Sequence, residues 1–344
     1  MSRRPTMTLL VNPTAGAGRA RRAVPGVAAE LVRGLPDYLL RVIHTRSFTD
    51  AKLQALAVTR TSVEAGDAGE RPDMLLVMGG DGMASIGLNA CAGTQVRLGV
   101  IPAGTGNDFT KGMGVPTTGT AAVAGIISGA QRRVDLACVE GELTGGARRR
   151  HVGSVVSTGY DARVNYRTNH RKFSLGSLSY GWDALAELAR FEPMHYRITL
   201  DGVEREDPAM LIAVGNAGFF GGGMHICPFA DPGDGILDVT IVHPVSRFTL
   251  VRMLKGMYNG SFVRDPCIEL VRARRVRIDG DDMFGMADGE ELGQVPLDVS
   301  VQHGALHLLG ADGMTPLGTP PRAIPGPPPE AIEAAEPADH GPTA

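Results

Sequence analysis

Short apolar runs alternate with stretches of helical pattern through the first third of the chain. The expected strands are Thr8–Asn12, Leu39–His44, Met74–Met78 and Leu98–Pro102, and the expected helices between them are Ala20–Leu35, Thr49–Thr59 and Ala84–Ala92. A continuous apolar run of this length predicts a strand that is buried on both faces. Strands that alternate with helices predict a doubly wound α/β domain with a mostly parallel sheet, which binds ligands at the carboxyl ends of its strands.

From about residue 133 onward the pattern changes to short β-rich segments that are bounded by turn residues. This pattern predicts a second, mostly antiparallel domain, interrupted by one amphipathic helix at about Leu175–Arg190. The chain after Gly313 is rich in proline and alanine, which predicts a disordered tail. The expected domains are 6–132, 133–311, with a last strand that returns to the first domain, and the tail 312–344.

Charge and cysteine content narrow the class of partner and the compartment. A net charge of −3 over 344 residues gives no polycation for nucleic acid. Four cysteines without a CxxC pair, and no apolar run of about 18 residues, predict a cytoplasmic protein. Basic residues gather at Arg148–Arg150, Arg163–Lys172 and Arg272–Arg277. These clusters are either solvated faces or a surface for an anionic membrane at the inner face of the cell.

Glycine-rich turns follow three of the expected strands, at Asn12–Ala20, Gly79–Ser85 and Pro102–Gly114. Glycine lets backbone amides approach a phosphate, and the helix that follows directs its positive end at the anion. None of the turns contains the P-loop pattern with its lysine, and none is a GxGxxG motif. Three such turns at successive strand ends indicate one common nucleotide site.

Asp81 places a carboxylate inside the second of these turns. A carboxylate beside a polyphosphate is repelled unless a divalent cation lies between them. The turn therefore predicts a polyphosphate loop that also holds Mg²⁺, directly or through water. The alternative is a plain Asp-Gly turn.

Five stretches occur in an order that resembles the bacterial soluble diacylglycerol and lipid kinases, to which sphingosine and ceramide kinases are related. They are "NPTAG", "GGDG", "PAGTGNDFTKGMGVP", "GFFGGGMHICPFADPGDGILDV" and "ADGE", and the resemblance covers about residues 8 to 310. It implies an N-terminal nucleotide domain, a C-terminal β-sandwich domain and a site in the cleft between them. A homodimer is left open.

The resemblance also implies roles for individual residues. The implied ATP contacts are Asn12, Pro13, Thr14, Ala15, Gly16, Thr45, Gly79, Gly80, Asp81, Gly82, Met83, Ala84, Ser85, Thr105, Asn107 and Asp108. Asp231, Asp234 and the backbone carbonyl of Ile236 are implied as ligands of Mg²⁺, with a β-turn of solvated aspartates as the alternative. Asp288 is implied as the base that accepts the hydroxyl proton, with Glu290 as the alternative.

Three positions depart from the usual motifs of this family. Met83 stands where a threonine is usual, Ser85 where an asparagine is usual, and Ala15 where a serine is usual. Each change removes or shortens a side-chain donor, which is worth about 0.5–1.5 kcal/mol. Since backbone amides still line the turns, we expect altered nucleotide handling together with retained activity.

The acceptor is expected to be a lipid hydroxyl. Apolar side chains beside flexible glycines form either a lipid cleft or part of the core: Phe219, Phe220, Met224, Ile226 and Phe229. The expected reaction is ATP- and Mg²⁺-dependent phosphorylation of diacylglycerol to phosphatidic acid, a step of phospholipid biosynthesis. The alternatives are a sphingoid-base or other lipid kinase, an NAD kinase-like enzyme, or a non-catalytic nucleotide- or lipid-binding homologue.

Overall fold

The computed structural model describes residues 4–64, 72–159, 193–288 and 290–311. The expected helix Leu175–Arg190, the basic stretch Arg163–Lys172 and the tail 312–344 lie outside the described residues.

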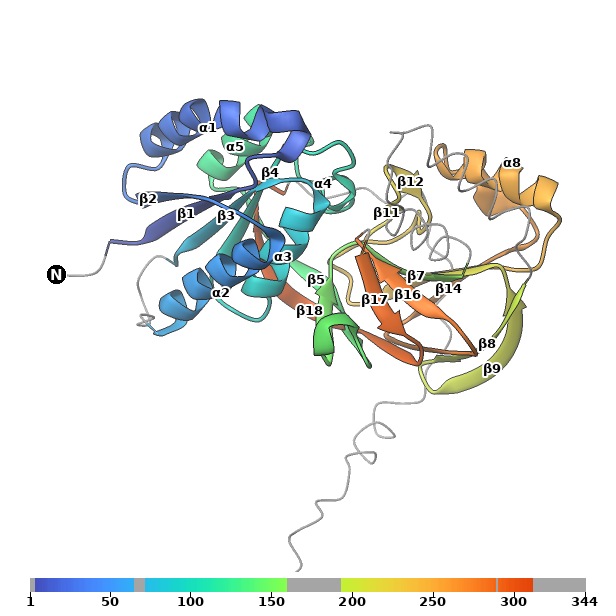
Figure 1. Cartoon of the computed structure of the whole chain (residues 1–344). Coiled ribbons are helices and arrows are strands. Elements are labelled where there is room, and N and C mark those ends of the chain that lie inside the picture. The colour runs from blue at the N-terminus through green and yellow to red at the C-terminus, as the bar shows by residue number, and fades with distance from the viewer. Residues whose placement is uncertain (1–3, 65–71, 160–192, 289, 312–344) are drawn as a thin grey trace, which may run out of the picture.

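The first part of the chain is a parallel sheet with helices on both faces (Figure 1). Its elements are β1 (Thr6–Val11), α1 (Ala15–Gly34), β2 (Leu39–His44), α2 (Phe48–Glu64), β3 (Met74–Gly79), α3 (Asp81–Cys91), β4 (Arg97–Pro102), α4 (Asp108–Gly112) and α5 (Gly119–Ser128). The strand order β2-β1-β3-β4 is parallel throughout. The predicted doubly wound domain is confirmed.

Two apolar cores explain why the sheet is covered on both faces. Side chains of α1 and α5, among them Leu31 and Val123, pack with Leu9 and Leu76 on one face. Side chains of α2 and α3 pack with the alternate residues of the same strands on the other face. Because both faces of β1, β3 and β4 are buried, these strands read in the sequence as continuous apolar runs.

The second part of the chain is an antiparallel sandwich. Its elements are β5 (Gln131–Glu140), η1 (Thr144–Gly146), β6 (Arg149–Val152), β7 (Val155–Gly159), β8 (Met194–Leu200), β9 (Val203–Ala209), β10 (Leu211–Gly215), β11 (Phe219–Phe220), β12 (Met224–His225), β13 (Leu237–Val242), α8 (Arg247–Met257), η2 (Ser261–Arg264), β14 (Ile268–Ala273), β15 (Arg275–Asp279), β16 (Phe284–Ala287), β17 (Glu290–Gln294) and β18 (Leu297–Leu309). One layer has the order β14-β13-β10-β7-β16-β17 and packs through a shared core on β15, β8 and their neighbours. The predicted antiparallel β-sandwich is confirmed.

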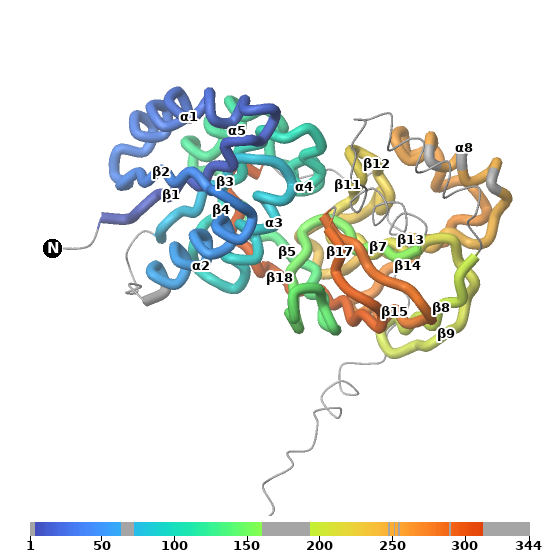
Figure 2. The backbone as a smooth tube through the Cα atoms, in the orientation of Figure 1, coloured from blue at the N-terminus to red at the C-terminus, as the bar shows by residue number. Residues whose placement is uncertain are grey.

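A ribbon of two long strands, β5 and β18, runs through both parts of the molecule (Figure 2). One end of β18 pairs parallel with β4 at His307 and Leu308. The other end pairs antiparallel with β15, where Ser300 lies opposite Arg275. The last described strand therefore belongs to the sheet of the first part as well as to the sandwich.

The register between β5 and β18 shifts between Gln302 and Leu306. Gly304 lies in this irregularity with φ +58°. The carboxylate of Asp135, which is 1% exposed, accepts the N–H of Gly304 at 2.6 Å and the N–H of Gly235 at 2.7 Å. Asp135 thus binds the bulge of the ribbon to the loop before β13.

No helix within the described ranges is long and apolar enough to cross a membrane.

Candidate functional site

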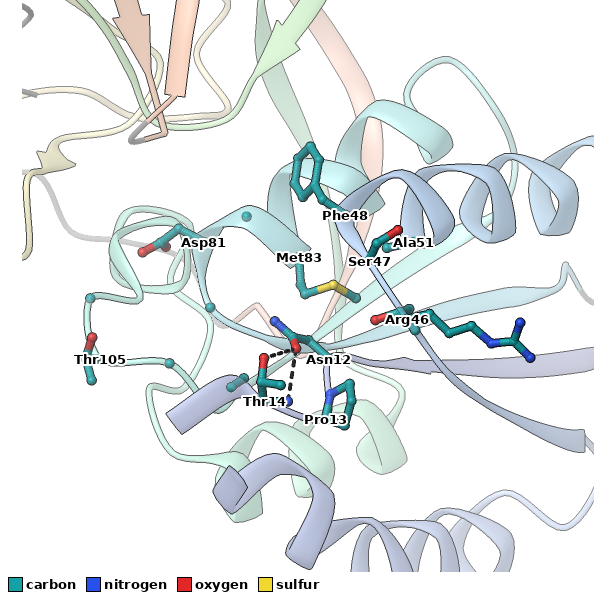
Figure 3. Close-up of a pocket in the computed structure, with 16 residues that line it drawn as sticks. Asn12, Pro13, Thr14, Arg46, Ser47, Phe48, Ala51, Asp81, Met83 and Thr105 are labelled. Carbon is teal, nitrogen blue, oxygen red and sulfur yellow. Dashed lines mark hydrogen bonds between the residues drawn. The ribbon is translucent and has the colours of Figure 1, made fainter. Parts of the chain in front are cut away.

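A cavity of about 500 Å³ lies at the carboxyl ends of β1, β3 and β4 (Figure 3). The predicted nucleotide residues that line it are Asn12, Pro13, Thr14, Ala15, Thr45, Gly80, Asp81, Gly82, Met83 and Thr105. The three glycine turns therefore meet at one mouth, as their positions after successive strands predict.

The first turn is held by a side chain at its start. The side-chain oxygen Oδ1 of Asn12 accepts hydrogen bonds from the backbone N–H of Thr14 at 3.1 Å and from the Thr14 hydroxyl at 2.8 Å. The next residues adopt left-handed conformations from Gly16 to Gly18. A Cβ atom on Gly16 would lie 2.3 Å from the Ala103 carbonyl, so only glycine fits there. Gly16 therefore shapes the turn without lining the cavity.

The second and third turns cross each other at two glycines. A Cβ atom added to Gly104 would lie 2.6 Å from the Cα atom of Gly80. Such a distance is shorter than any normal contact, so the crossing requires glycine at position 104. The close approach brings the backbone of both turns to one wall of the cavity.

Met83 lies on the floor of the cavity, with its side chain between Asn12 and Phe48 in Figure 3. Only 5% of its surface is exposed, and it belongs to the core beneath α2 and α3. The thioether thus occupies apolar volume at the place where the related motifs have a hydroxyl group.

The beginning of α2 contributes residues that the sequence analysis missed. Arg46, Ser47, Phe48 and Ala51 line the cavity beside Thr45. Ser47 Oγ accepts the N–H of Asp50 at 3.1 Å, and the Asp50 carboxylate accepts the N–H of Arg46 at 2.8 Å. This capping box is visible in the sequence as S-x-x-D directly before a helical stretch.

Several predicted nucleotide residues do not line this cavity: Gly16, Gly79, Ala84, Ser85, Asn107 and Asp108. Ser85 is buried, and its hydroxyl accepts a hydrogen bond from Arg150 at 3.2 Å. Asn107 precedes α4 with φ +55° and donates to the Gly104 carbonyl at 3.3 Å.

A second cavity of about 170 Å³ lies between the two parts of the molecule. Three aspartates line it, Asp81, Asp108 and Asp288, and its apolar walls include Phe219, Phe220 and Met286. Because Asp81 lines both cavities, the nucleotide cavity and this second cavity share one wall.

Asp81 and Asp108 are held in place by backbone amides. Asp81 is the first residue of α3 and accepts the N–H of Phe109 at 3.0 Å. Asp108 accepts the N–H of Gly222 at 2.6 Å, and its other oxygen is buried and lies 3.6 Å from the ammonium group of Lys111. Burial raises the pKa of Asp81, the N–H of Phe109 lowers it, and the charge of Asp108 raises it further.

Asp288 lies in the tight connection between β16 and β17, with φ +51°. Burial raises the pKa of this carboxyl group to about 7, Arg150 lowers it, and the charges of Asp81 and Glu290 raise it. One carboxylate oxygen is buried without a hydrogen-bond partner in the described part of the chain. Asp288 therefore lines the second cavity in surroundings that disfavour its charged form, and a hydrogen bond with Ser154 partly offsets this by lowering the pKa.

Glu290 differs from Asp288 in its partner. Its carboxylate forms an ion pair with Arg150 at 2.6 Å. Arg150 lies on β6 with a side chain that is 14% exposed, and it connects Ser85 on α3 to Glu290 on β17.

Arg148 and Arg149, the neighbours of Arg150, have exposed side chains that pair with Glu142 and Glu140. The predicted basic cluster at 148–150 is thus divided, and Arg150 belongs to the site. In the sequence, Arg150 could be distinguished from Arg149 only by strand alternation, which directs neighbouring side chains to opposite faces.

The acidic turn before β13 is bound by arginines. Asp231 pairs with Arg132 at 2.6 Å, and Asp234 pairs with Arg272. The Asp234 carboxylate also accepts the N–H of Ile236 at 3.1 Å. Among the described residues no three His, Cys, Asp or Glu side chains form a group that could hold a metal ion. In this arrangement guanidinium groups neutralise the two carboxylates of the turn, and its assignment to Mg²⁺ stays a prediction.

Comparison with known proteins places these features in one family. Residues 6–139 match the diacylglycerol kinase catalytic domain, and residues 154–310 match the YegS C-terminal NAD kinase beta sandwich-like domain. A diacylglycerol kinase of Mycobacterium tuberculosis is 33% identical over 305 residues, which are 88% of this chain and 94% of the relative. The chain belongs to the bacterial diacylglycerol kinase family.

Further relatives agree with this membership. A diacylglycerol kinase of Bacillus subtilis is 28% identical over 232 residues, covering 65% of this chain and 73% of the relative. The crystal structure of a diacylglycerol kinase from Bacillus anthracis superposes with a TM-score of 0.65 at 22% identity, covering 88% of this chain and 96% of that one. The last comparison shows the shared fold. The chain is thus a lipid kinase of the diacylglycerol kinase family.

Four of the five apolar candidates for lipid contact divide into two groups in this kinase, and the fifth, Phe229, is half-buried. Phe219 and Phe220 form β11 and line the second cavity, and Phe219 stacks on His225 with ring centroids 4.1 Å apart. Met224 and Ile226 are buried in a core cluster, where they form part of the packing beneath α8. The interpretation as core is therefore correct for the second pair.

Proposed function

We propose that this kinase transfers the γ-phosphoryl group of ATP to the hydroxyl of diacylglycerol and produces phosphatidic acid. The observation that carries the proposal is the shared wall at Asp81 between a glycine-lined cavity and a cavity that is lined by Asp288 and by apolar walls. A donor in the first cavity and a hydroxyl in the second would meet at this wall. The curated relatives named diacylglycerol kinase support this choice of acceptor.

In the proposed reaction Asp288 accepts the proton of the lipid hydroxyl. The hydroxyl oxygen then forms a bond to the γ-phosphorus, and the bond from that phosphorus to the bridging oxygen breaks, which releases ADP. A base works best when its pKa lies near the working pH, and the pKa of about 7 for Asp288 meets that condition. Glu290 is the weaker candidate because Arg150 already binds its carboxylate.

Mg²⁺ would neutralise phosphate charge when it is bound. Asp81 and Asp108 are the residues that would hold it, because both line the second cavity and Asp81 also lines the nucleotide cavity. Lys111, 3.6 Å from one Asp108 oxygen, would have to give up that oxygen to the ion. Mg²⁺ commonly uses one or two carboxylates together with the phosphates of the substrate. The predicted ligands Asp231, Asp234 and Ile236 would serve only after Arg132 and Arg272 had moved away.

The test compares Asp288→Asn with Glu290→Gln in a kinase assay with labelled ATP. We expect Asp288→Asn to lower kcat on the order of 10²-fold, the scale of a positioned base, and to leave ATP affinity unchanged. Asp282→Asn is the matched control, since Asp282 is an exposed aspartate with a similar φ of +53°. A loss below tenfold in Asp288→Asn, with Glu290→Gln inactive, would transfer the role to Glu290.

The acceptor is tested with the same assay on a panel of diacylglycerol, a sphingoid base and NAD⁺. We expect diacylglycerol to give the highest kcat/KM. Preferred phosphorylation of either other compound would overturn the proposed acceptor, and binding of ATP without turnover of any of them would support a non-catalytic homologue.

A further inference from the structure

Helix α8 carries an exposed aromatic and basic surface outside the two cavities. Phe248 is 82% exposed, the highest value among the exposed large apolar side chains of the described residues, and Tyr258 just after the helix is 60% exposed. The opposite side of the helix buries Leu250, Met253 and Met257 in the sandwich. A single exposed apolar side chain is ordinary, and this helix has an exposed aromatic side chain near each of its two ends.

The charged side chains near these aromatic side chains are mostly positive. Lys255 and Arg264 are exposed, and neither has an ion-pair partner among the described residues. Arg252 pairs with Asp265 at 2.6 Å and is itself 66% exposed. The helix contains no acidic residue, although the whole chain has a net charge of −3. The surface is thus locally basic on a chain that is slightly acidic.

The position of α8 connects this surface to the second cavity. The helix contacts β12, and β12 pairs with β11, whose residues Phe219 and Phe220 line the cavity. Figure 1 shows this hairpin between α4 and α8. A surface that α8 contacts would therefore lie next to the wall of the cavity proposed for the lipid.

We propose that α8 docks the kinase on an anionic lipid bilayer through Phe248, Tyr258, Lys255 and Arg264. Aromatic side chains insert at the boundary between headgroups and acyl chains, while basic side chains bind anionic headgroups. A second copy of this chain fits the surface less well, because a symmetric contact would bring like charges together. The proposal rests on the lipid acceptor proposed above, since docking would bring the second cavity to the membrane that holds the acceptor.

The test measures co-sedimentation of the full chain with two kinds of vesicle, phosphatidylcholine alone and phosphatidylcholine with phosphatidylglycerol. Neither vesicle contains diacylglycerol, so the result does not depend on turnover. We expect stronger binding to the anionic vesicles, weaker binding at high salt, and a loss of about tenfold or more in the double variant Phe248→Ser with Lys255→Glu. Leu53→Ser is the matched control, because Leu53 on α2 is 62% exposed in the other part of the molecule.

Unchanged vesicle binding in the double variant, or an equal loss in Leu53→Ser, would overturn the proposal. A change of oligomeric state in sedimentation, with vesicle binding unchanged, would assign the surface to contact between copies instead. Turnover of a water-soluble short-chain diacylglycerol distinguishes the proposal of membrane docking from the proposal of the acceptor. Because this substrate is not in a membrane, we expect the double variant to phosphorylate it as the unmodified chain does. Absence of that turnover in the unmodified chain, with anionic vesicle binding intact, would contradict the proposed acceptor alone.

Discussion

Asp288 is both a residue of a tight hairpin turn and a residue of the second cavity. An Asp-Gly pair between two short strands predicts a tight hairpin turn, and Asp288 does occupy such a turn with φ +51°. At this turn Asp288 lines the same cavity as Asp81 and Asp108. The turn could be predicted from the local sequence. The burial that raises the pKa to about 7 could not, since it comes from strands far apart in the chain.

The pH dependence of the reaction follows from this carboxyl group. Asp288 accepts a proton only when it is ionised, so we expect kcat/KM to fall about tenfold per unit as the pH decreases below about 7. Arg150 lowers the pKa of Asp288, so Arg150→Gln should move the acid limb of the pH–rate profile to higher pH. Arg150→Lys keeps a positive charge and should restore most of the original profile.

Arg149→Gln is the control for this measurement, because Arg149 is exposed and pairs with Glu140 instead. If the pH–rate profile does not move in Arg150→Gln, Arg150 does not lower the pKa of Asp288 as described, whatever happens to kcat itself.

The crossing of the two glycine turns gives a second prediction. Gly104→Ala places a methyl group 2.6 Å from the Cα atom of Gly80, which forces the turns apart. We expect ATP affinity to fall at least tenfold, as measured by calorimetric titration, because the backbone wall of the cavity moves. Gly80→Ala is the matched comparison: its Cβ atom meets only the Cα atom of Gly104, at an ordinary 3.5 Å, so its loss should be much smaller. Equal losses would indicate that the crossing does not set the shape of the cavity.

Strands with two buried faces were predictable, and the charged edge strand β9 was not. The runs that became β1, β3 and β4 are apolar throughout because helices cover both faces. β9, by contrast, reads "VEREDPA", with mostly exposed or half-buried residues, and it lies at the end of its sheet. Edge strands carry charges that limit pairing with other chains, so their apolar pattern is weak. Helix α8 was not predicted, although its buried residues Leu250, Met253 and Met257 recur at helical spacing.

The bulge in β18 gives a prediction for stability. Asp135→Ala leaves the N–H groups of Gly304 and Gly235 without their acceptor, and each lost bond of this kind costs roughly 1–3 kcal/mol when the group stays buried. We expect the free energy of unfolding in urea to fall by about that amount or more. Glu142→Ala should change it by less than about 0.5 kcal/mol, because the pair of Glu142 with Arg148 is exposed. Equal stability of the two variants would contradict the role given to Asp135.

The two cavities depend on the whole molecule to different degrees. Residues of the first part alone line the nucleotide cavity, and their turns could be recognised because each follows its own strand. The second cavity needs α4, β7, β11 and β16 together. Motifs in the sequence named several of its residues separately, yet only the packing of the two parts reveals that Asp81 and Asp288 line one space. The domain boundaries at 132 and 311 stay predictions.

The position of β18 has a consequence for the order in which the molecule can be completed during translation. The outer edge of β4 is paired by His307 and Leu308, which are synthesised about 200 residues after β4 itself. Until then the nascent parallel sheet has an open edge beside its nucleotide turns, the kind of edge that pairs with other chains. A ribosome that stops before residue 297 therefore leaves the first part of the kinase unfinished, although every glycine turn is already present. Loss of β18 therefore leaves the sheet of the first part without the strand that pairs with β4.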